Sequence, residues 1–169
     1  PRIICYQAQR KDRPQVFVDR GLFLLPVKNG HYVIVKRTES CDGYIDIPPI
    51  TSPPVEFRSN LTFELRSSKV GDSEMQHVDK AYALGIIQDF CGVDPMFLTI
   101  RGRKYCPEFS FSVGSQALVA KGVQTEVDAG YEGEDTVVLI EAKNTKVKDI
   151  IIRQMYYPYS QWWNHTKKD

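Results

Sequence analysis

The sequence contains few of the residues that build thiolate metal sites or disulfide frameworks. Four cysteines, Cys5, Cys41, Cys91 and Cys106, are spread along 169 residues, and no two of them lie within a few residues of each other. That spacing excludes a zinc knuckle, in which paired cysteines stand two to four residues apart. A chain of this length can build a core without disulfides. We therefore expect free thiols in a reducing, cytoplasmic compartment of the prokaryotic type.

Other functional classes are excluded by motifs that the sequence lacks. No apolar run is long enough to span a membrane, and the first residues do not have the form of a secretory signal. Three scattered histidines provide no nucleophile–base arrangement. There is also no Gly-x-Ser-x-Gly elbow and no glycine-rich phosphate loop. We therefore expect neither a membrane protein nor a serine hydrolase.

The formal charge of +1 conceals an uneven distribution along the chain. Residues 1–37 carry a net charge of +6 and residues 141–169 a net charge of +3. Between them, residues 38–79 carry −5 and residues 121–135 carry −4. Acidic segments flanked by basic ones suit a metal site that meets a polyanion, although folded surfaces also scatter charge without such a purpose.

The first part of the chain predicts a β-rich segment. Residues 31–37 are β-branched and aromatic, and residues 21–26 can form a hairpin with them because Asn29-Gly30 is a strong turn signal. Residues 41–60 contain four prolines and are expected to form a loop. We interpret residues 1–69 as an N-terminal β-rich extension that contacts DNA.

The rest of the chain predicts a helix, several strands and a second helix. Ser73 and Gln76 have the capping-box spacing, and an apolar stripe follows to a stop at Gly92. A helix is also expected from residue 145 or 146 to about residue 157, before Pro158. The class is therefore α/β (α+β), with a mixed sheet flanked by helices. The strands are expected at residues 97–101, 109–113, 116–123, 123–129 and 136–143, the last two joined by a turn at residues 132–135.

The last hairpin carries the residues that suggest chemistry. Side chains two apart in a strand share a face, so Glu141 and Lys143 point the same way, and Asp128 on the preceding strand can lie beside Glu141. Clustered carboxylates are costly unless a cation neutralises them, and oxygen ligands suit Mg²⁺. Two alternatives stay open: Glu141 and Lys143 can form a solvated cross-strand pair, and Asp128 can cap a turn at Gly130. Glu126 is the nearest rival to Asp128 as a ligand.

Asp128 stands thirteen positions before Glu141-Ala142-Lys143, between two predicted helices. This arrangement resembles the PD-(D/E)xK nuclease superfamily, and the chain looks like a type II restriction endonuclease. The resemblance covers roughly residues 70–160, and Val127 stands where the motif has proline. It implies a restriction-endonuclease-like nuclease core over residues 70–169.

The resemblance also implies roles for individual residues. Asp128, Glu141 and the carbonyl of Ala142 would hold Mg²⁺, for which Mn²⁺ would substitute. Lys143 would orient or help deprotonate the attacking water, and Gln154 on the following helix matches a glutamine found near the site in some branches. Glu74 is the candidate for a further metal ligand from the first helix, with Asp79 behind it. A simpler reading of Glu74 is an acid that favours the helix dipole, and a simpler reading of Gln154 is a surface residue.

For substrate binding, the compact basic turn of Arg101, Arg103 and Lys104 could grip phosphates, as could Lys146, or these could be ordinary solvated side chains. The resemblance implies hydrolysis of double-stranded DNA by a homodimer. Two rival functions are a non-catalytic nucleic-acid-binding module and a DNA repair or junction-resolving nuclease. The superfamily core adds a strand after its second helix, and none is visible before Asp169. Either the chain is a fragment or that strand is supplied differently.

Overall fold

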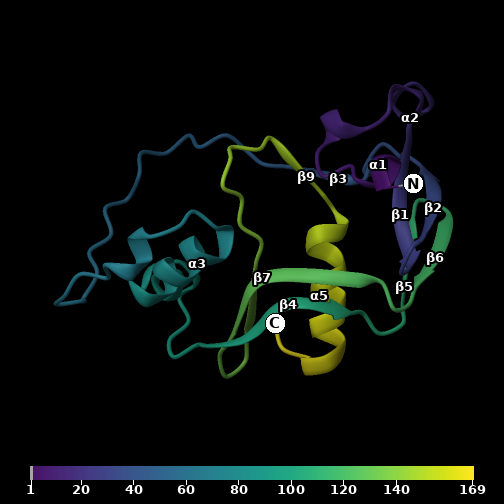
Figure 1. The fold of residues 1–169 in the computed structure, drawn as a ribbon. Helices are drawn as coiled ribbons and strands as arrows, with labels where there is room; N and C mark the ends of the chain where they lie inside the picture. The colour runs from purple at the N-terminus through teal and green to yellow at the C-terminus, as the bar shows by residue number, and fades with distance from the viewer. Residues whose placement is uncertain (1) are drawn as a thin grey trace. The chain divides into compact units, whose positions relative to one another are not determined.

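The computed structural model describes residues 2–169 (Figure 1), and its fold is α+β, as the sequence predicted. The helices are α1 (Arg2–Cys5), α2 (Gln15–Arg20), α3 (Glu74–Ala83), α4 (Ile86–Cys91) and α5 (Arg153–Thr166), with 3₁₀ turns η1 (Arg10–Asp12) and η2 (Ser67–Lys69). The strands are β1 (Leu22–Lys28), β2 (His31–Lys36), β3 (Tyr44–Asp46), β4 (Phe97–Tyr105), β5 (Phe109–Val113), β6 (Gln116–Ala120), β7 (Gln124–Glu132), β8 (Val137–Ile140) and β9 (Asp149–Ile151).

The strands form several small sheets where the sequence suggested one mixed sheet. β1 pairs with β2, β3 with β9 and β5 with β6, while β4, β7 and β8 form a three-stranded sheet in that order. Tight turns explain the small hairpins. Gly30 and Gly114 adopt positive φ angles of 75° and 57° in the connections, which brings each strand back onto its sequence neighbour.

The chain divides into two compact units that interleave along the sequence. The first unit comprises the chain up to Pro48 together with Arg103–Glu126 and Val147–Lys167. The second comprises Pro49–Gly102, Val127–Lys146 and Lys168–Asp169. The division differs from the expected boundary between residues 69 and 70, because β4 and β7 each contribute residues to both units.

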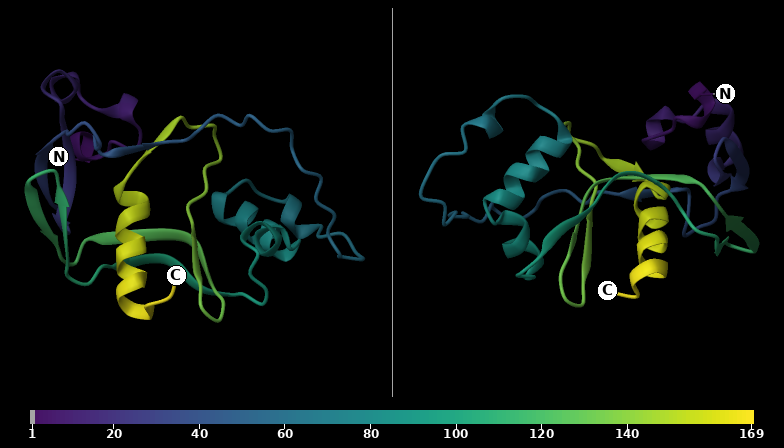
Figure 2. Two further views of the ribbon diagram at one scale, coloured as in Figure 1. Left: turned by 180° about the vertical axis from the view of Figure 1, so that it is seen from behind. Right: turned by 60° about the horizontal axis from the view of Figure 1, so that its bottom comes forward.

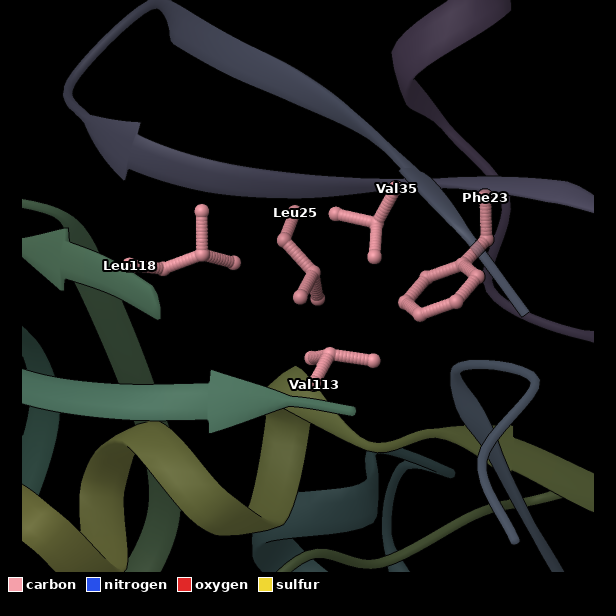
Figure 3. Close-up of a cluster of buried hydrophobic side chains, with 5 residues drawn as sticks. All are labelled: Phe23, Leu25, Val35, Val113 and Leu118. Atoms are coloured by element: carbon pink, nitrogen blue, oxygen red, sulfur yellow. The ribbon is translucent and has the colours of Figure 1, made fainter. Parts of the chain in front are cut away.

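In the first unit, two hairpins enclose a hydrophobic cluster. Phe23, Leu25 and Val35 come from the β1–β2 hairpin, and Val113 and Leu118 come from β5 and β6. Figure 3 shows these side chains pointing toward one another between the two hairpins. Burying them provides the apolar contact that holds the hairpins together.

A neighbouring cluster in the same unit joins α5 to the strands. Tyr157 packs with Phe109 and Val123, and its hydroxyl donates a hydrogen bond of 2.9 Å to the carbonyl of Pro26. Burial raises the pKa of the Tyr157 phenol above its ordinary value. The sequence predicted that the helix ends at about residue 157, but Pro158 lies inside α5, which continues to Thr166.

In the second unit, α3 and α4 pack on β7. Val78 and Ile87 lie against Ala129 and Tyr131, and the Tyr82 ring stacks on Tyr131 with centroids 4.5 Å apart. The single helix expected over residues 73–92 is interrupted because Gly85 has a φ of 86°, which no right-handed helix accepts.

The expected start of the last helix is irregular in the structure. Residues 145–148, expected to begin that helix, form no helix, and β9 follows them. The side chain of Asp149 explains this, since it accepts a hydrogen bond of 2.6 Å from the backbone of Arg10 and β9 pairs with β3. Residues 49–66 contain neither helix nor strand and run as a long loop in both views of Figure 2. This agrees with the loop expected over residues 41–60, except that β3 forms within that range. None of the helices within residues 2–169 combines the length and apolar character needed to cross a bilayer.

After α5, the last residue of the chain forms two backbone hydrogen bonds within the second unit. The backbone of Asp169 donates to the carbonyl of Asp135 at 3.1 Å and accepts from the amide of Val137 at 2.6 Å. These bonds hold Asp169 beside the first residue of β8.

Candidate active site

The β7–β8 hairpin brings the two acidic residues of the motif close together. In its antiparallel register Ala129 faces Ile140, and Asp128 and Glu141 are the next residues along the chain beyond this pair. The negative charge of Asp128 acts on the carboxyl of Glu141. β8 ends at Ile140, so Glu141, Ala142 and Lys143 occupy the first positions after the strand.

Hydrogen bonds tie this short segment to β7. The backbone amide of Ala142 donates to Oδ2 of Asp128 at 2.8 Å. The ammonium of Lys143 forms an ion pair with Glu141 and also donates to the carbonyl of Ala142 at 2.9 Å. Asp128, Glu141 and Lys143, which the sequence predicted to converge, are therefore linked through the Ala142 peptide.

The start of α3 contributes a third carboxylate to the same place. Ser73 caps the helix, accepting a hydrogen bond of 3.2 Å from the amide of Gln76. Glu74 is the first helical residue, and its Oε1 accepts a hydrogen bond of 3.0 Å from the backbone amide of Asn144. Asn144 also donates its side-chain amide to the carbonyl of Asp72 at 2.7 Å, so two bonds join α3 to the segment that follows β8.

Opposing influences act on the charge of Glu141. Burial raises the pKa of its carboxyl above the ordinary value, while the ion pair with Lys143 lowers it. The negative charges of Asp128 and Glu74 raise it further. Asp128 and Glu74 are therefore both close enough to repel the charge of Glu141, whose side chain is 13% exposed.

The oxygen atoms around Lys143 match the ligands that Mg²⁺ prefers. Within the described residues, no group of three or more His, Cys, Asp or Glu side chains is arranged to hold a metal ion, so Glu74 does not complete a ready-made set. The implied set is smaller: two carboxylates and the Ala142 carbonyl. The Lys143 ammonium already contacts two of these three groups, and so stands where a cation would be held. The carboxylate and carbonyl oxygens near Lys143 are therefore of the chemical type that Mg²⁺ accepts as ligands.

Arg101, a member of the predicted basic group, interacts electrostatically with Asp128. Its guanidinium forms an ion pair with Asp79, which raises the pKa of Arg101 the most. The charges of Tyr131 and Asp128 add to the same shift. Arg101 therefore lies within electrostatic reach of the candidate site, and Asp79 serves as its partner.

The predicted compact basic turn is part of strand β4, which pairs with β7. Gly102, with a φ of 72°, interrupts the pleat there without reversing the chain. Arg103 forms an exposed ion pair of 3.2 Å with Glu126, and Lys104 is exposed. Lys146 is exposed in the irregular segment after the motif.

The predicted residues divide between the two units. Asp128, Glu141, Ala142, Lys143, Glu74, Arg101 and Lys146 belong to the second unit, and Gln154, Arg103 and Lys104 belong to the first. Glu126, the rival ligand, is also in the first unit, where it pairs with Arg103. Asn144 and Asp72 were not predicted from the sequence. Asn144 directly follows the motif and Asp72 directly precedes the helix cap, and these positions are the features that could have pointed to them.

Comparison with known proteins gives one match. A family model described as a domain of unknown function (DUF6997) matches residues 39–169, a range that contains every residue of the candidate site. No curated protein and no solved structure matches the chain.

Proposed function

We propose that this chain, which belongs to the family described as a domain of unknown function (DUF6997), is a metal-dependent endonuclease that hydrolyses double-stranded DNA. We place it in the PD-(D/E)xK superfamily, as a type II restriction enzyme. The observation that carries the proposal is the convergence of Asp128 on β7 with Glu141 directly after β8, where the ammonium of Lys143 contacts both Glu141 and the Ala142 carbonyl.

Each group has a chemical task in this reaction. Asp128, Glu141 and the Ala142 carbonyl would hold Mg²⁺ or, as a substitute, Mn²⁺. When bound, the ion supplies a water of lowered pKa and stabilises charge on the phosphate. The ammonium of Lys143 bonds to Glu141 and to the Ala142 carbonyl, so it can orient the water and stabilise the negative charge that develops on phosphorus.

Burial argues against the simplest alternative for Glu141 and Lys143. Their side chains are 13% and 26% exposed, whereas the exposed pair Lys121–Glu108 shows 73% and 59%. A solvated ion pair on the surface contributes little to stability and has no reason to be buried. Asp128, for its part, accepts from Ala142 and lies within a strand that continues to Glu132, so it does not cap a turn at Gly130.

The test is a plasmid-nicking assay with Mg²⁺ or with EDTA. We expect the wild type to nick only with Mg²⁺, and Asp128→Ala, Glu141→Ala and Lys143→Ala to lose cleavage by at least about a hundredfold. DNA affinity of the two acidic variants should be equal or higher, because each removes negative charge facing a polyanion. The matched controls are Lys121→Ala and Glu108→Ala, which break an exposed ion pair and should cut normally.

Two results would contradict the proposal. Normal cutting by Asp128→Ala or Glu141→Ala would remove the assigned site. Retained DNA binding with no metal-dependent cleavage by the wild type would favour the non-catalytic module. A repair or junction-resolving enzyme would instead cut branched duplexes in preference to a ladder of linear ones.

We further propose a homodimer, since cutting both strands of a near-palindrome needs two copies of one site. Analytical ultracentrifugation with and without a duplex that the protein cuts tests this. A monomer bound to such a duplex would contradict it.

A further inference from the structure

A pocket of about 290 Å³ opens in the first unit, formed by the N-terminal segment, the β1–β2 turn, the start of β7 and the first turn of α5. It has no role in the proposed hydrolysis. Its chemically distinctive lining residues are Tyr6, Lys28, Asn29, Tyr32, Gln124 and Arg153.

The charge of the pocket has one sign. Lys28 and Arg153 line it, and no carboxylate does. Among the described residues, neither cation forms an ion pair with an acidic side chain, in contrast to Arg10, which contacts several aspartates. Two uncompensated cations that face one cavity favour an anionic ligand.

The walls also offer aromatic faces and amides. Tyr6 is 70% exposed and Tyr32 is 36% exposed, so both rings are accessible. Asn29 and Gln124 each present an amide with donors and an acceptor. Aromatic faces stack on flat heterocycles, and amides bond to the edges of such rings.

Hydrogen bonds hold the walls in place without a ligand. The backbone amide of Asn29 donates to the carbonyl of Gly122 at 3.2 Å, and the backbone amide of Lys121 donates to the carbonyl of Val27 at 2.9 Å. Tyr32 faces Pro26 in the β1–β2 register, and Pro26 accepts from Tyr157. Because the cavity is preformed, little ordering cost opposes binding.

The N-terminal wall is anchored as well. Gln7, which follows Tyr6, is 1% exposed, and its carbonyl accepts a hydrogen bond of 3.0 Å from the hydroxyl of Tyr44. The amide of Ile151 donates to Ala8 at 3.1 Å. The segment that carries Tyr6 is therefore bound to β3 and β9 of the same unit.

We infer that this pocket binds one nucleotide, with its phosphate between Lys28 and Arg153 and its base against the tyrosines. The volume admits one nucleotide unit and no duplex. The ligand can be a free nucleoside monophosphate or the phosphorylated end of a single strand, which share this chemistry. The inference does not depend on the metal site.

Isothermal titration calorimetry of the whole chain in EDTA tests the inference, because EDTA removes the divalent ions that a metal-dependent reaction would need. The probes are adenosine, cytidine and their 5′-monophosphates, inorganic phosphate, and a 5′-phosphorylated trinucleotide. At least one monophosphate or the trinucleotide should bind at least tenfold tighter than the nucleosides and than phosphate. Tighter binding of the trinucleotide identifies a strand end as the ligand, and tighter binding of the monophosphate identifies the free nucleotide.

Variants separate this pocket from general charge attraction. Lys28→Ala and Tyr32→Ala should each weaken binding about tenfold, and Tyr32→Phe should retain most of it. Lys36→Ala is the matched control, since it removes an exposed lysine from the other end of the same hairpin. Equal losses in Lys28→Ala and Lys36→Ala, equal affinity for phosphate alone, or no binding of any nucleotide probe would overturn the inference. Circular dichroism of each variant verifies that it is folded.

Discussion

Glu141 shows how one side chain responds to its surroundings, because burial and two neighbouring carboxylates oppose its charge while Lys143 supports it. Its pKa is raised in the folded state, so the folded protein holds the proton to higher pH than the unfolded chain does. Such a group lowers the free energy of unfolding as the pH rises from the carboxyl pKa of the unfolded chain, about 4.3, through the higher pKa of the folded protein. Below that window the cost disappears.

We expect Glu141→Gln to gain stability relative to the wild type as the pH rises from about 4 toward neutrality. Urea unfolding in EDTA at a series of pH values measures the difference between the two proteins. A difference that stays constant with pH, or that shrinks as the pH rises, would contradict the raised pKa.

Tyr131 offers a second prediction at this scale. Its hydroxyl is buried and has no hydrogen-bond partner among the described residues, and burial raises the pKa of the phenol to about 12. Removing an unsatisfied buried hydroxyl relieves its desolvation cost, so Tyr131→Phe should stabilise the protein by about 1 kcal/mol.

Tyr157→Phe is the matched control for that measurement. Tyr157 is equally buried, but its hydroxyl bonds to Pro26, so its loss should destabilise the protein by about 1 kcal/mol. Chemical denaturation of both variants measures whether each change in the free energy of unfolding is positive or negative. Equal effects would show that the two hydroxyls have similar environments.

The closeness of the motif residues was predictable from sequence because a hairpin joins their segments. The strand expected over residues 136–143 ends at Ile140, so the ion pair of Glu141 with Lys143 and the bond from Ala142 to Asp128 determine their positions, where the sequence suggested strand alternation. The partner of Arg101 was not predictable, because Asp79 lies on a helix 22 positions earlier and the pairing depends on how α3 packs on the sheet.

At the scale of elements, helix α3 connects its cap to the candidate site. Ser73 holds the helix start from which Glu74 bonds to Asn144. Ser73→Ala should cost about 1 kcal/mol of stability through the lost cap and should also loosen this contact. Ser112→Ala, at an exposed strand position, is the control. Thermal unfolding compares them, and an equal change in both would mean that the cap contributes nothing.

Hairpins were easier to predict than the chain between them. The β1–β2 and β7–β8 hairpins were expected because they pair sequence neighbours through turn signals that can be read locally. For β5 and β6 the sequence predicted two strands, and the structure adds their pairing. β9 was missed because its partner β3 lies about a hundred residues earlier, and that pairing prevailed over the helical pattern near residue 145.

At the scale of the whole molecule, ligand binding should change stability by mass action. If Asp128 and Glu141 hold Mg²⁺, the ion at about a hundred times its dissociation constant should add about 2.7 kcal/mol and raise Tm by several degrees. Thermal unfolding at constant ionic strength measures this. Asp128→Ala should show no shift, and a shift equal to that of the wild type would place the ion elsewhere.

The α+β class could be inferred from the order of helical and strand patterns, but the two units could not. Their boundary runs through β4 and β7, and nothing in the composition of either strand marks the point where contacts change. The division arises from contacts between segments far apart in sequence, which a linear pattern does not contain.

The contact of Lys143 with Glu141 and the Ala142 carbonyl makes the resting site its own counterion store. If the proposed divalent ion binds there, it competes with a tethered ammonium, so its apparent affinity falls by the free energy of that contact. Binding of the ion would then require a higher ion concentration than the oxygen ligands alone would need. The lysine displaced by the ion would become available to a phosphate.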